Sequence, residues 1–400
     1  MILWEEAAAS IDRETPAAVL PRERLPARQG LGRWLAEDAV SRLDLPPFDK
    51  SAMDGFAVRA GGRRESYRVL ETVAAGKTPT QALDEGAAVK VMTGAPVPEG
   101  TGRVIKVEDV REEGGSIRLL KDAQERNLCR QGEDLRRGDV VLRAGVRLGP
   151  VDVANLIGCG VTEVEVVRPA RLAILSTGDE LVDDPALAGP GRIMNTNGPM
   201  LRFLAEQHGF AVVSEASVPD DPARTLAALR EARESADLVL FSGGVSAGDF
   251  DFVKEAFPQA GLRVHFTQVA IKPGKPTVFA TAPGQAVFGL PGNPVAVFVT
   301  FHLFALRAAA RLRGGSLPDP REVSLPLAGA FRRRRAERCE FVPCRLVSDG
   351  SLEAVPFHGS AHLAALSQAD GFFAVPRGTG ELAAGSPVRF LPLSLMGARA

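Results

Sequence analysis

Between residues 169 and 317, short apolar runs alternate with longer segments whose apolar positions recur at helical spacing. The short runs have the length of strands that are buried on both faces of a sheet. This alternation predicts a doubly wound, mostly parallel sheet with helices on both faces. The predicted strands are 171–175, 211–218, 237–241, 264–271 and 286–290, and the predicted helices are 198–208, 222–235, 251–257 and 293–312.

Residues 42–137 follow a different pattern, in which short β-like runs are separated by glycines and polar turns. This pattern predicts a small, mostly antiparallel β domain. The flanking residues 27–41 and 138–168 predict a small linking α/β module, with a strand over residues 139–143 and helices over residues 30–39 and 151–156. The first of these helices rests on Leu31, Trp34 and Leu35, which recur at helical spacing. The β domain is therefore an insertion in this module. Its predicted strands are 67–72, 87–92, 102–107 and 116–120.

The two ends of the chain predict smaller units. Residues 1–26 predict a helix up to about Asp12, followed by a proline-marked connector, and we expect this segment to pack on the α/β domain. Residues 318–400 begin with the linker Pro318-Asp319-Pro320 and predict a C-terminal β domain, with strands near 339–347 and 371–376. The whole sequence therefore predicts a multi-domain α/β protein.

Composition narrows the class of protein. Of the 400 residues, 45% are hydrophobic and 24% are charged, which is typical of a soluble globular chain with several domains. The formal net charge of −1 excludes a general basic field for nucleic acid. Residues 332–335 form the only strong basic run, which we interpret as a solvated face, with an anion or partner contact as the alternative.

The sequence predicts neither a secretory signal nor a membrane span. The first six residues lack a basic region followed by a long apolar core. The most apolar stretch, 295–306, is shorter than the about 20 residues that cross a bilayer, so we expect a buried core helix. The four cysteines have no CxxC or zinc spacing, and a reduced, cytoplasmic location is expected.

The loop after the predicted strand 237–241 carries the clearest candidate chemistry. Its glycines let backbone N–H groups point at a bound anion without a side chain in the way. Its carboxylates suit a hard cation that bridges to phosphate oxygens. The candidate residues are Ser242, Gly243, Gly244, Ser246, Asp249 and Asp251.

Three more loops have related sequences at the ends of predicted strands. Neighbouring strand ends of a doubly wound sheet place their loops at one crevice, so we expect a site for a phosphorylated small molecule with magnesium. The alternative is that each loop is an ordinary turn. The residues are Ser176, Thr177, Gly178 and Glu180 after 171–175, Lys272, Gly274 and Lys275 after 264–271, and Pro291, Gly292 and Asn293 after 286–290.

Other acidic and hydroxyl residues lie in loops elsewhere. Asp54 belongs to a proline- and aspartate-rich loop, Thr93 follows a predicted strand, and Asp134 lies in a third acidic loop. The alternative for Asp54 is an Asx turn that caps local N–H groups. Asp220 precedes Asp221 between two prolines, where a helix N-cap is the alternative.

Eight sequence blocks follow one another along the chain: PPFDKSAMDGFAV, MTGAPVPEG, GEDLRRGDVVL, ILSTGDELV, NTNGPML, SGGVSAGDFDFVKE, AIKPGKP and GLPGNPVAVF. In these blocks and their order the chain resembles molybdopterin molybdenumtransferases, the MoeA family, whose animal relative is the E domain of gephyrin. This resemblance covers essentially the whole chain and is weak after residue 320. It implies a central domain similar to MogA and MoaB, and the STGDE and SGGVS blocks are shared with molybdopterin adenylyltransferases and CinA-type proteins.

The resemblance implies a Mg²⁺-dependent reaction that inserts molybdate into adenylylated molybdopterin and releases AMP. It implies a homodimer in which the β domain of one subunit approaches the α/β domain of the other. The implied protein partners are the molybdopterin adenylyltransferase and apo-molybdoenzymes. It assigns catalytic roles to Asp54, Thr93, Asp134, Glu180, Asp220 and Asp251, metal ligation to Glu180, Asp220 and Asp251, and a molybdate contact to Ser360.

Two departures from the family pattern concern the oxyanion. Gln268 stands where many relatives carry a basic residue, and Pro343 stands where an arginine is often found. Arg345 lies two residues on, which is the same face of a strand, and is a candidate substitute. A catalytically weak molybdopterin-binding carrier or scaffold, and a molybdopterin adenylyltransferase, stay open as alternatives. Molybdate and tungstate, nearly alike in size and charge, both fit the prediction.

Overall fold

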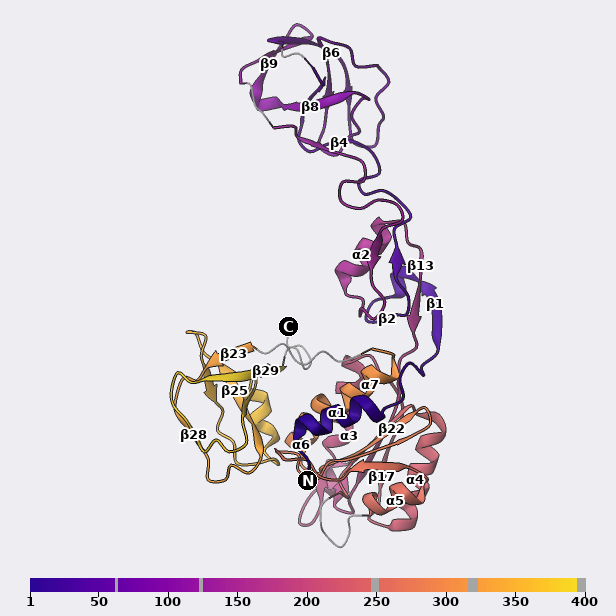
Figure 1. The fold of residues 1–400 in the computed structure, drawn as a ribbon, viewed down its shortest axis with the longest axis vertical. Helices are drawn as coiled ribbons and strands as arrows, with labels where there is room; N and C mark the ends of the chain where they lie inside the picture. The colour runs from indigo at the N-terminus through magenta and orange to yellow at the C-terminus, as the bar shows by residue number, and fades with distance from the viewer. Residues whose placement is uncertain (62–63, 122–124, 246–251, 316–322, 394–400) are drawn as a thin grey trace. The chain divides into compact units, whose positions relative to one another are not determined.

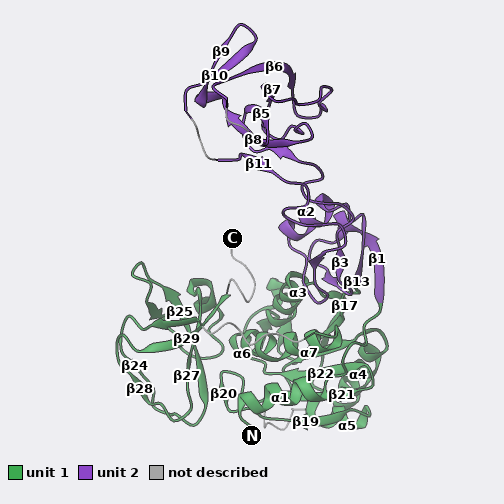
Figure 2. Cartoon of the chain, turned by 45° about the horizontal axis from the view of Figure 1, so that its top comes forward, with its two compact units in different colours: residues 1–21, 167–400 green, residues 22–166 purple. Residues whose placement is uncertain are grey.

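The computed structural model describes residues 1–61, 64–121, 125–245, 252–315 and 323–393. The chain forms two compact units, which are coloured separately in Figure 2. Unit 1 comprises residues 1–21 and 167–400, and unit 2 comprises residues 22–166. The chain thus leaves unit 1 after its first helix, α1 (Trp4–Glu14), and returns to it at residue 167.

The centre of unit 1 is a sheet of six strands, β14 (Arg171–Thr177), β17 (Ala211–Val218), β18 (Leu238–Ser242), β19 (Arg263–Phe266), β21 (Val278–Ala282) and β22 (Gln285–Leu290). They lie in the order β17-β14-β18-β22-β21-β19. The first four strands are parallel, whereas β21 is antiparallel to β22 and β19 is antiparallel to β21. The predicted mostly parallel sheet is confirmed, with a mixed edge.

Helices cover this sheet, as Figure 1 shows, and they are α3 (Asn197–Gln207), α4 (Pro222–Ser235), α5 (Val253–Gln259), α6 (Pro294–Thr300) and α7 (Leu306–Leu312). Leu229 of α4 and Phe257 of α5 pack with the buried Val239 and Phe241 of β18 in one core cluster. α3 packs on β14 and β17, α6 packs on α3 and β22, and α1 packs on α7.

A π-helical turn, η4 (Phe301–Ala305), joins α6 and α7 into one continuous helix of 19 residues. This helix is apolar and long enough to pass for a membrane span by length and composition. However, 78% of its most apolar window is buried inside the protein. The expected core helix is therefore confirmed, and it is longer than the apolar stretch on which the prediction rested.

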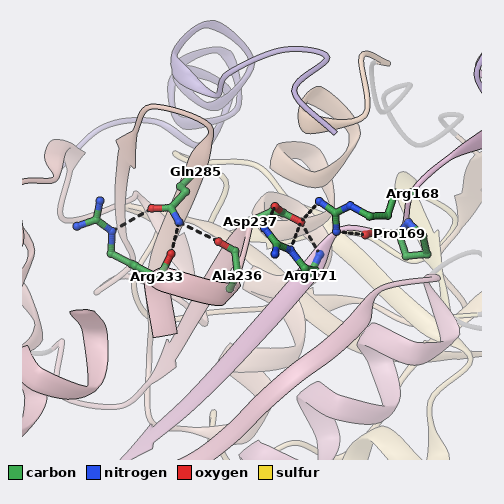
Figure 3. A network of polar contacts seen from close by, with 7 residues as sticks. All are labelled: Arg168, Pro169, Arg171, Arg233, Ala236, Asp237 and Gln285. Carbon is green, nitrogen blue, oxygen red and sulfur yellow. Dashed lines mark hydrogen bonds and ion pairs between the residues drawn. The ribbon is translucent and has the colours of Figure 1, made fainter. Parts of the chain in front are cut away.

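A buried carboxylate fixes the N-terminal ends of the central strands (Figure 3). Asp237, immediately before β18, accepts hydrogen bonds from the backbone N–H of Arg171 (2.7 Å) and from the guanidinium groups of Arg171 and Arg168 (2.9 Å each). Nearby, Gln285 at the start of β22 donates to the carbonyl of Ala236 (2.9 Å). Burial acts to raise the pKa of Asp237, but the bonds from the two arginines outweigh it, and the pKa lies below the usual range.

The C-terminal sheet of unit 1 contains β20 (Ile271–Lys272), β25 (Cys339–Leu346), β27 (Gly371–Val375), β29 (Pro387–Pro392) and β23 (Val323–Pro326), in that order, with β26 (Leu352–Ala354) beside β25. β20 follows the central strand β19 and runs parallel to β25, with Lys272 opposite Glu340. This pairing joins the C-terminal sheet to the α/β part of the unit.

Short elements complete the described part of unit 1. They are β15 (Leu181–Val182), η3 (Pro185–Leu187), β16 (Ile193–Met194), β24 (Phe331–Arg332), η5 (Leu363–Gln368) and β28 (Glu381–Leu382).

Unit 2 contains a six-stranded sheet built from β5 (Gly55–Arg59), β6 (Ser66–Val73), β7 (Ala87–Val91), β8 (Thr101–Lys106), β9 (Val110–Glu113) and β10 (Ser116–Leu119). The order is β8-β5-β7-β6-β10-β9, and only β6 and β7 pair in parallel among these neighbours. The predicted antiparallel character is confirmed. Beside this sheet lie β4 (Lys50–Ser51), paired with β11 (Leu128–Cys129), and η2 (Val107–Asp109).

The rest of unit 2 consists of β1 (Arg22–Pro26), η1 (Ala27–Gln29), β2 (Trp34–Leu35), β3 (Ala39–Val40), β12 (Val140–Leu142), α2 (Pro150–Gly158) and β13 (Glu163–Val167). The helix predicted over residues 30–39 is wrong, because this segment forms β2 and β3. Gly32 has a φ of +76°, which ends any helix there, and Leu31 is 59% exposed. The spacing of Leu31, Trp34 and Leu35 therefore does not mark a buried helical face.

Candidate functional site

Loops at the C-terminal ends of the parallel strands line a cavity of about 600 Å³, the loop cavity. The loops follow β14, β17, β18 and β22, as the strand order requires, because these four ends lie at one edge of the sheet. Ten predicted site residues line it: Thr177, Gly178, Glu180, Asp220, Ser242, Gly243, Gly244, Pro291, Gly292 and Asn293. The predicted Ser246, Asp249 and Asp251 lie outside the described residues.

The glycines of these loops are required by local geometry. Gly243 has a φ of +99°, and a Cβ atom there would lie 2.7 Å from the carbonyl oxygen and the hydroxyl of Thr177. Gly178 has a φ of +146°, and a Cβ atom there would lie 2.5 Å from the carboxylate of Glu180. At Gly243, only a residue without a side chain allows the loops after β14 and β18 to approach one another this closely.

Replacing Gly243 by Ala is expected to destabilise unit 1 by about 1–3 kcal/mol and to displace Thr177, because the positive φ and the backbone clash act together. Thermal unfolding of the full chain measures the loss. Gly284→Ala is the matched control, since Gly284 has a φ of +74° in the turn between β21 and β22 but has open space around its Cβ position. Equal losses for the two variants would contradict the close approach to Thr177.

Two carboxylates face the loop cavity and are candidate ligands for a magnesium ion. Glu180 and Asp220 both line the cavity, and Asp220 exchanges backbone-to-carboxylate hydrogen bonds with Asp179 (3.1 and 3.4 Å). The alternative N-cap role belongs to Asp221, whose carboxylate accepts from the N–H of Arg224. Among the described residues no group of three or more His, Cys, Asp or Glu is placed to hold a metal. Two carboxylates nevertheless fit Mg²⁺, which commonly takes one or two of them together with phosphate oxygens and water.

Asn197, at the start of α3, is a site residue that the sequence reasoning missed. Its Nδ2 donates to the hydroxyl of Ser242 (2.8 Å) and to the carbonyl of Gly292 (2.6 Å), which joins the loops after β18 and β22. The block NTNGPML marked this segment without assigning it a role. The remaining wall comes from Leu181, Ile193, Met194, Thr196, Val245, Pro276, Pro294, Ala361 and Leu363.

Among the described residues of unit 1, five predicted site residues do not line the loop cavity. Ser176 is buried at the end of β14, and Gly274 packs against Ile271 and Thr300. Lys275 is exposed, and Lys272 forms an ion pair with Glu340 (2.7 Å). Ser360 joins the C-terminal part to the α6 loop, since its hydroxyl accepts from Asn293 (2.7 Å) and its carbonyl accepts from the N–H of Val295 (3.0 Å).

A second cavity, the basic cavity, has a volume of about 670 Å³ and lies where β20 meets the C-terminal sheet. Arg338 lies at this junction, where its guanidinium donates to the carbonyl of Ile271 (3.2 Å). Residues 357–359 line the basic cavity, while Ala361 and Leu363 line the loop cavity. One segment, residues 357–363, therefore contributes to both. The charged lining is Lys272, Arg332, Arg333, Arg334, Arg335, Glu337, Arg338 and Glu340, and the ring of His358 lies beside it.

In unit 2, Asp54 and Thr93 come together at the ends of neighbouring strands. The carboxylate of Asp54 accepts from the backbone N–H (2.7 Å) and from the hydroxyl (2.8 Å) of Thr93, and these bonds hold the pKa of Asp54 below its usual range. Asp134 lies in another loop of the same unit, where its N–H donates to the carbonyl of Leu45 (2.9 Å). All three residues are exposed.

Comparisons with known proteins decide the family. Residues 2–160 match the MoeA N-terminal region (domain I and II), residues 173–311 match a probable molybdopterin binding domain, and residues 326–393 match the MoeA C-terminal region (domain IV). The molybdopterin molybdenumtransferase of Staphylococcus aureus is 33% identical over 380 residues, which cover 92% of this chain and 90% of the relative. The chain belongs to the MoeA family. The resemblance read from its motifs is thereby confirmed, and so is its place among transferases of molybdenum cofactor biosynthesis.

Other relatives of this MoeA family member agree. The molybdopterin molybdenumtransferase of Staphylococcus epidermidis is 32% identical over 370 residues, covering 90% of this chain and 88% of the relative. The molybdopterin biosynthesis moeA protein of Pyrococcus horikoshii OT3 has 31% identity and a TM-score of 0.84, covering 98% of this chain and 99% of that chain. The multi-domain α/β fold is therefore that of the MoeA family.

The structure also shows where Pro343 and the candidate substitute Arg345 lie. Pro343 lies within β25, opposite Phe372 of β27. Arg345, the candidate substitute, forms an exposed ion pair with Glu353 (2.6 Å) and does not line the basic cavity. Arg338 on the same segment does line it, together with Lys272. In this MoeA family member, Arg338 rather than Arg345 is the basic residue of this segment at the cavity.

Proposed function

We propose that this protein inserts molybdate into adenylylated molybdopterin and releases AMP in a Mg²⁺-dependent reaction. The observation that carries the proposal is the pairing of two cavities of opposite character around residues 357–363. One is lined by glycines, hydroxyls and two carboxylates, and the other is lined by lysine and arginine. A phosphorylated pterin with a metal ion fits the first, and a free oxyanion fits the second.

In the loop cavity, the positive-φ glycines Gly243 and Gly244 leave the backbone free of side chains, so that N–H groups can approach phosphate oxygens. Asn197 holds the two flanking loops at a fixed separation. Glu180 and Asp220 would hold Mg²⁺. When bound, the ion offsets the charge of the diphosphate and polarises its phosphorus–oxygen bonds.

Molybdate would bind to Lys272 and Arg338 in the basic cavity, with Ser360 in the segment between the two cavities. Replacing Arg338 by Ala is expected to raise the KM for molybdate about ten-fold or more, because a charge-assisted hydrogen bond to the anion is lost. Steady-state AMP release at varied molybdate measures this. Arg345→Ala is the control on the same strand segment, and an equal change in both variants would contradict the assignment.

The β domain of unit 2 would contribute Asp54, Thr93 and Asp134 to the loop cavity of a second subunit, in a homodimer with shared sites. Asp54 suits this role because its carboxylate is exposed and is held in place by the two hydrogen bonds from Thr93. We place the protein in the cytoplasm, with the molybdopterin adenylyltransferase as supplier of the substrate and apo-molybdoenzymes as acceptors of the product.

The deciding experiment supplies the purified full chain with adenylylated molybdopterin, Mg²⁺ and molybdate, with tungstate in parallel, and measures AMP. We expect AMP release that requires both the oxyanion and Mg²⁺, and a product that activates an apo-molybdoenzyme. Tight binding of the pterin without AMP would instead identify a carrier or scaffold. Consumption of ATP with molybdopterin alone would identify an adenylyltransferase.

A further inference from the structure

The basic cavity has more positive charge than a single oxyanion needs. Six lysine and arginine residues line it, against two carboxylates, Glu337 and Glu340. Its volume of about 670 Å³ lies in the range of pockets for drug-sized ligands, about 300–1,000 Å³. A tetrahedral oxyanion on Lys272 and Arg338 would leave most of this space and charge unused.

The ion pairs of this cavity are unevenly distributed among its cations. Glu340, only 7% exposed, bridges Lys272 (2.7 Å) and the buried Arg333 (3.4 Å). Arg332 pairs with Glu381 (2.8 Å). Within the described ranges, no carboxylate lies within ion-pair distance of Arg334 or Arg335, and both are exposed. These two adjacent guanidinium groups are therefore available for a ligand with more than one negative group.

Aromatic rings form another part of this wall. The ring of His358 stacks on that of His362 with centroids 5.1 Å apart and 15° between the planes. His362 stacks in turn on Phe357, at 6.4 Å and 7°. His358 and Phe357 both line the cavity, and nearly parallel rings of this kind are a surface on which a planar base can stack.

We propose that the basic cavity binds a nucleoside polyphosphate, with its phosphates on Arg334 and Arg335 and its base against the ring of His358. Guanidinium groups bind phosphate oxygens through paired N–H donors. The nucleotide would share the cavity with Lys272 and Arg338, so it would compete with the oxyanion. This competition rests on the proposed function, whereas nucleotide binding itself does not.

The test is isothermal titration calorimetry of the full chain with ATP in the presence of EDTA, which removes any metal-dependent binding. The double variant Arg334→Ala/Arg335→Ala is expected to weaken ATP binding about ten-fold or more, because charge-assisted hydrogen bonds are lost from an exposed surface. Circular dichroism checks that this variant is folded. The matched variant Glu180→Gln/Asp220→Asn, altered in the loop cavity, is expected to bind ATP as the wild type does.

Three outcomes would overturn the proposal. The first is ATP binding that is unchanged in the double arginine variant. The second is ATP binding that appears only when Mg²⁺ replaces EDTA and that is then lost in Glu180→Gln/Asp220→Asn, which would place the nucleotide in the loop cavity. The third is inorganic pyrophosphate that binds as tightly as ATP, which would assign the cavity to polyphosphate without a base. If the protein does not bind ATP but still releases AMP in a molybdate-dependent reaction, the nucleotide proposal is wrong and the proposed function is unaffected.

Discussion

Glu180→Gln is expected to lower Mg²⁺-dependent AMP release by a factor on the order of 10²–10³, the loss seen when one electrostatic contact to a transition state is removed. The substitution removes a charge and keeps the size of the side chain. Glu180 lines the loop cavity, and its carboxylate lies against the backbone of Gly178. AMP release at saturating molybdate, measured across a range of Mg²⁺ concentrations, gives the effect.

The matched control for this variant is Asp183→Asn. Asp183 lies on the same segment and is exposed, but it does not line the cavity. We expect this variant to keep wild-type activity. Wild-type activity in Glu180→Gln at low Mg²⁺ would show that Glu180 is not a ligand of the metal ion. A loss that excess Mg²⁺ restores would support the assignment, since weakened metal binding is then the cause.

Asp237→Asn is expected to reduce the stability of the central sheet by about 2 kcal/mol at pH 7. Removing one partner of a buried pair costs about 3–5 kcal/mol, and the cost is smaller here because the arginine side chains are partly exposed, by 25% for Arg168 and 43% for Arg171. Hydrogen exchange at the amides of β14 and β18 measures this loss within unit 1. Glu353→Gln, which breaks an exposed pair with Arg345, is expected to change stability by less than about 0.5 kcal/mol.

The effect of Asp237 also has a defined pH dependence. Its folded pKa lies below the unfolded value of about 3.9. The ionised carboxylate therefore contributes its full stability above about pH 4, and this contribution is lost as the pH falls through the folded pKa. The difference between wild type and Asp237→Asn should be constant near neutral pH and shrink in acid. A difference that grows in acid would contradict the lowered pKa.

The central sheet could be predicted because buried parallel strands and covering helices have distinct periods along the chain. The prediction for 264–271 was incomplete for a physical reason. This apolar run divides between two sheets, with residues up to Phe266 in β19 and Ile271 in β20. β21 was missed because it joins β22 through a short turn at Gly284, whereas the expected pattern placed a helix between strands.

The candidate site could be predicted in part. Glycines and carboxylates at strand ends mark the loop cavity directly, since neighbouring parallel strands place their loops together. The partner of Lys272 could not be predicted, because Glu340 reaches it only through the pairing of β20 with β25. Arg338 was missed for the same reason. Asn197 makes its contacts through an amide that bonds to two distant loops, and no local pattern marks such bonds.

The position of α1 has a consequence for synthesis of the chain. Ala7, Ala8 and Ile11 are buried, and α1 packs on α7, which the ribosome completes only at residue 312. At about 5–20 residues per second, α1 waits on the order of 15–60 s for this partner, while unit 2 is translated and free to fold. Helix α1 can therefore complete its packing only after α7 has been made, and its apolar face is open to chaperones throughout that interval.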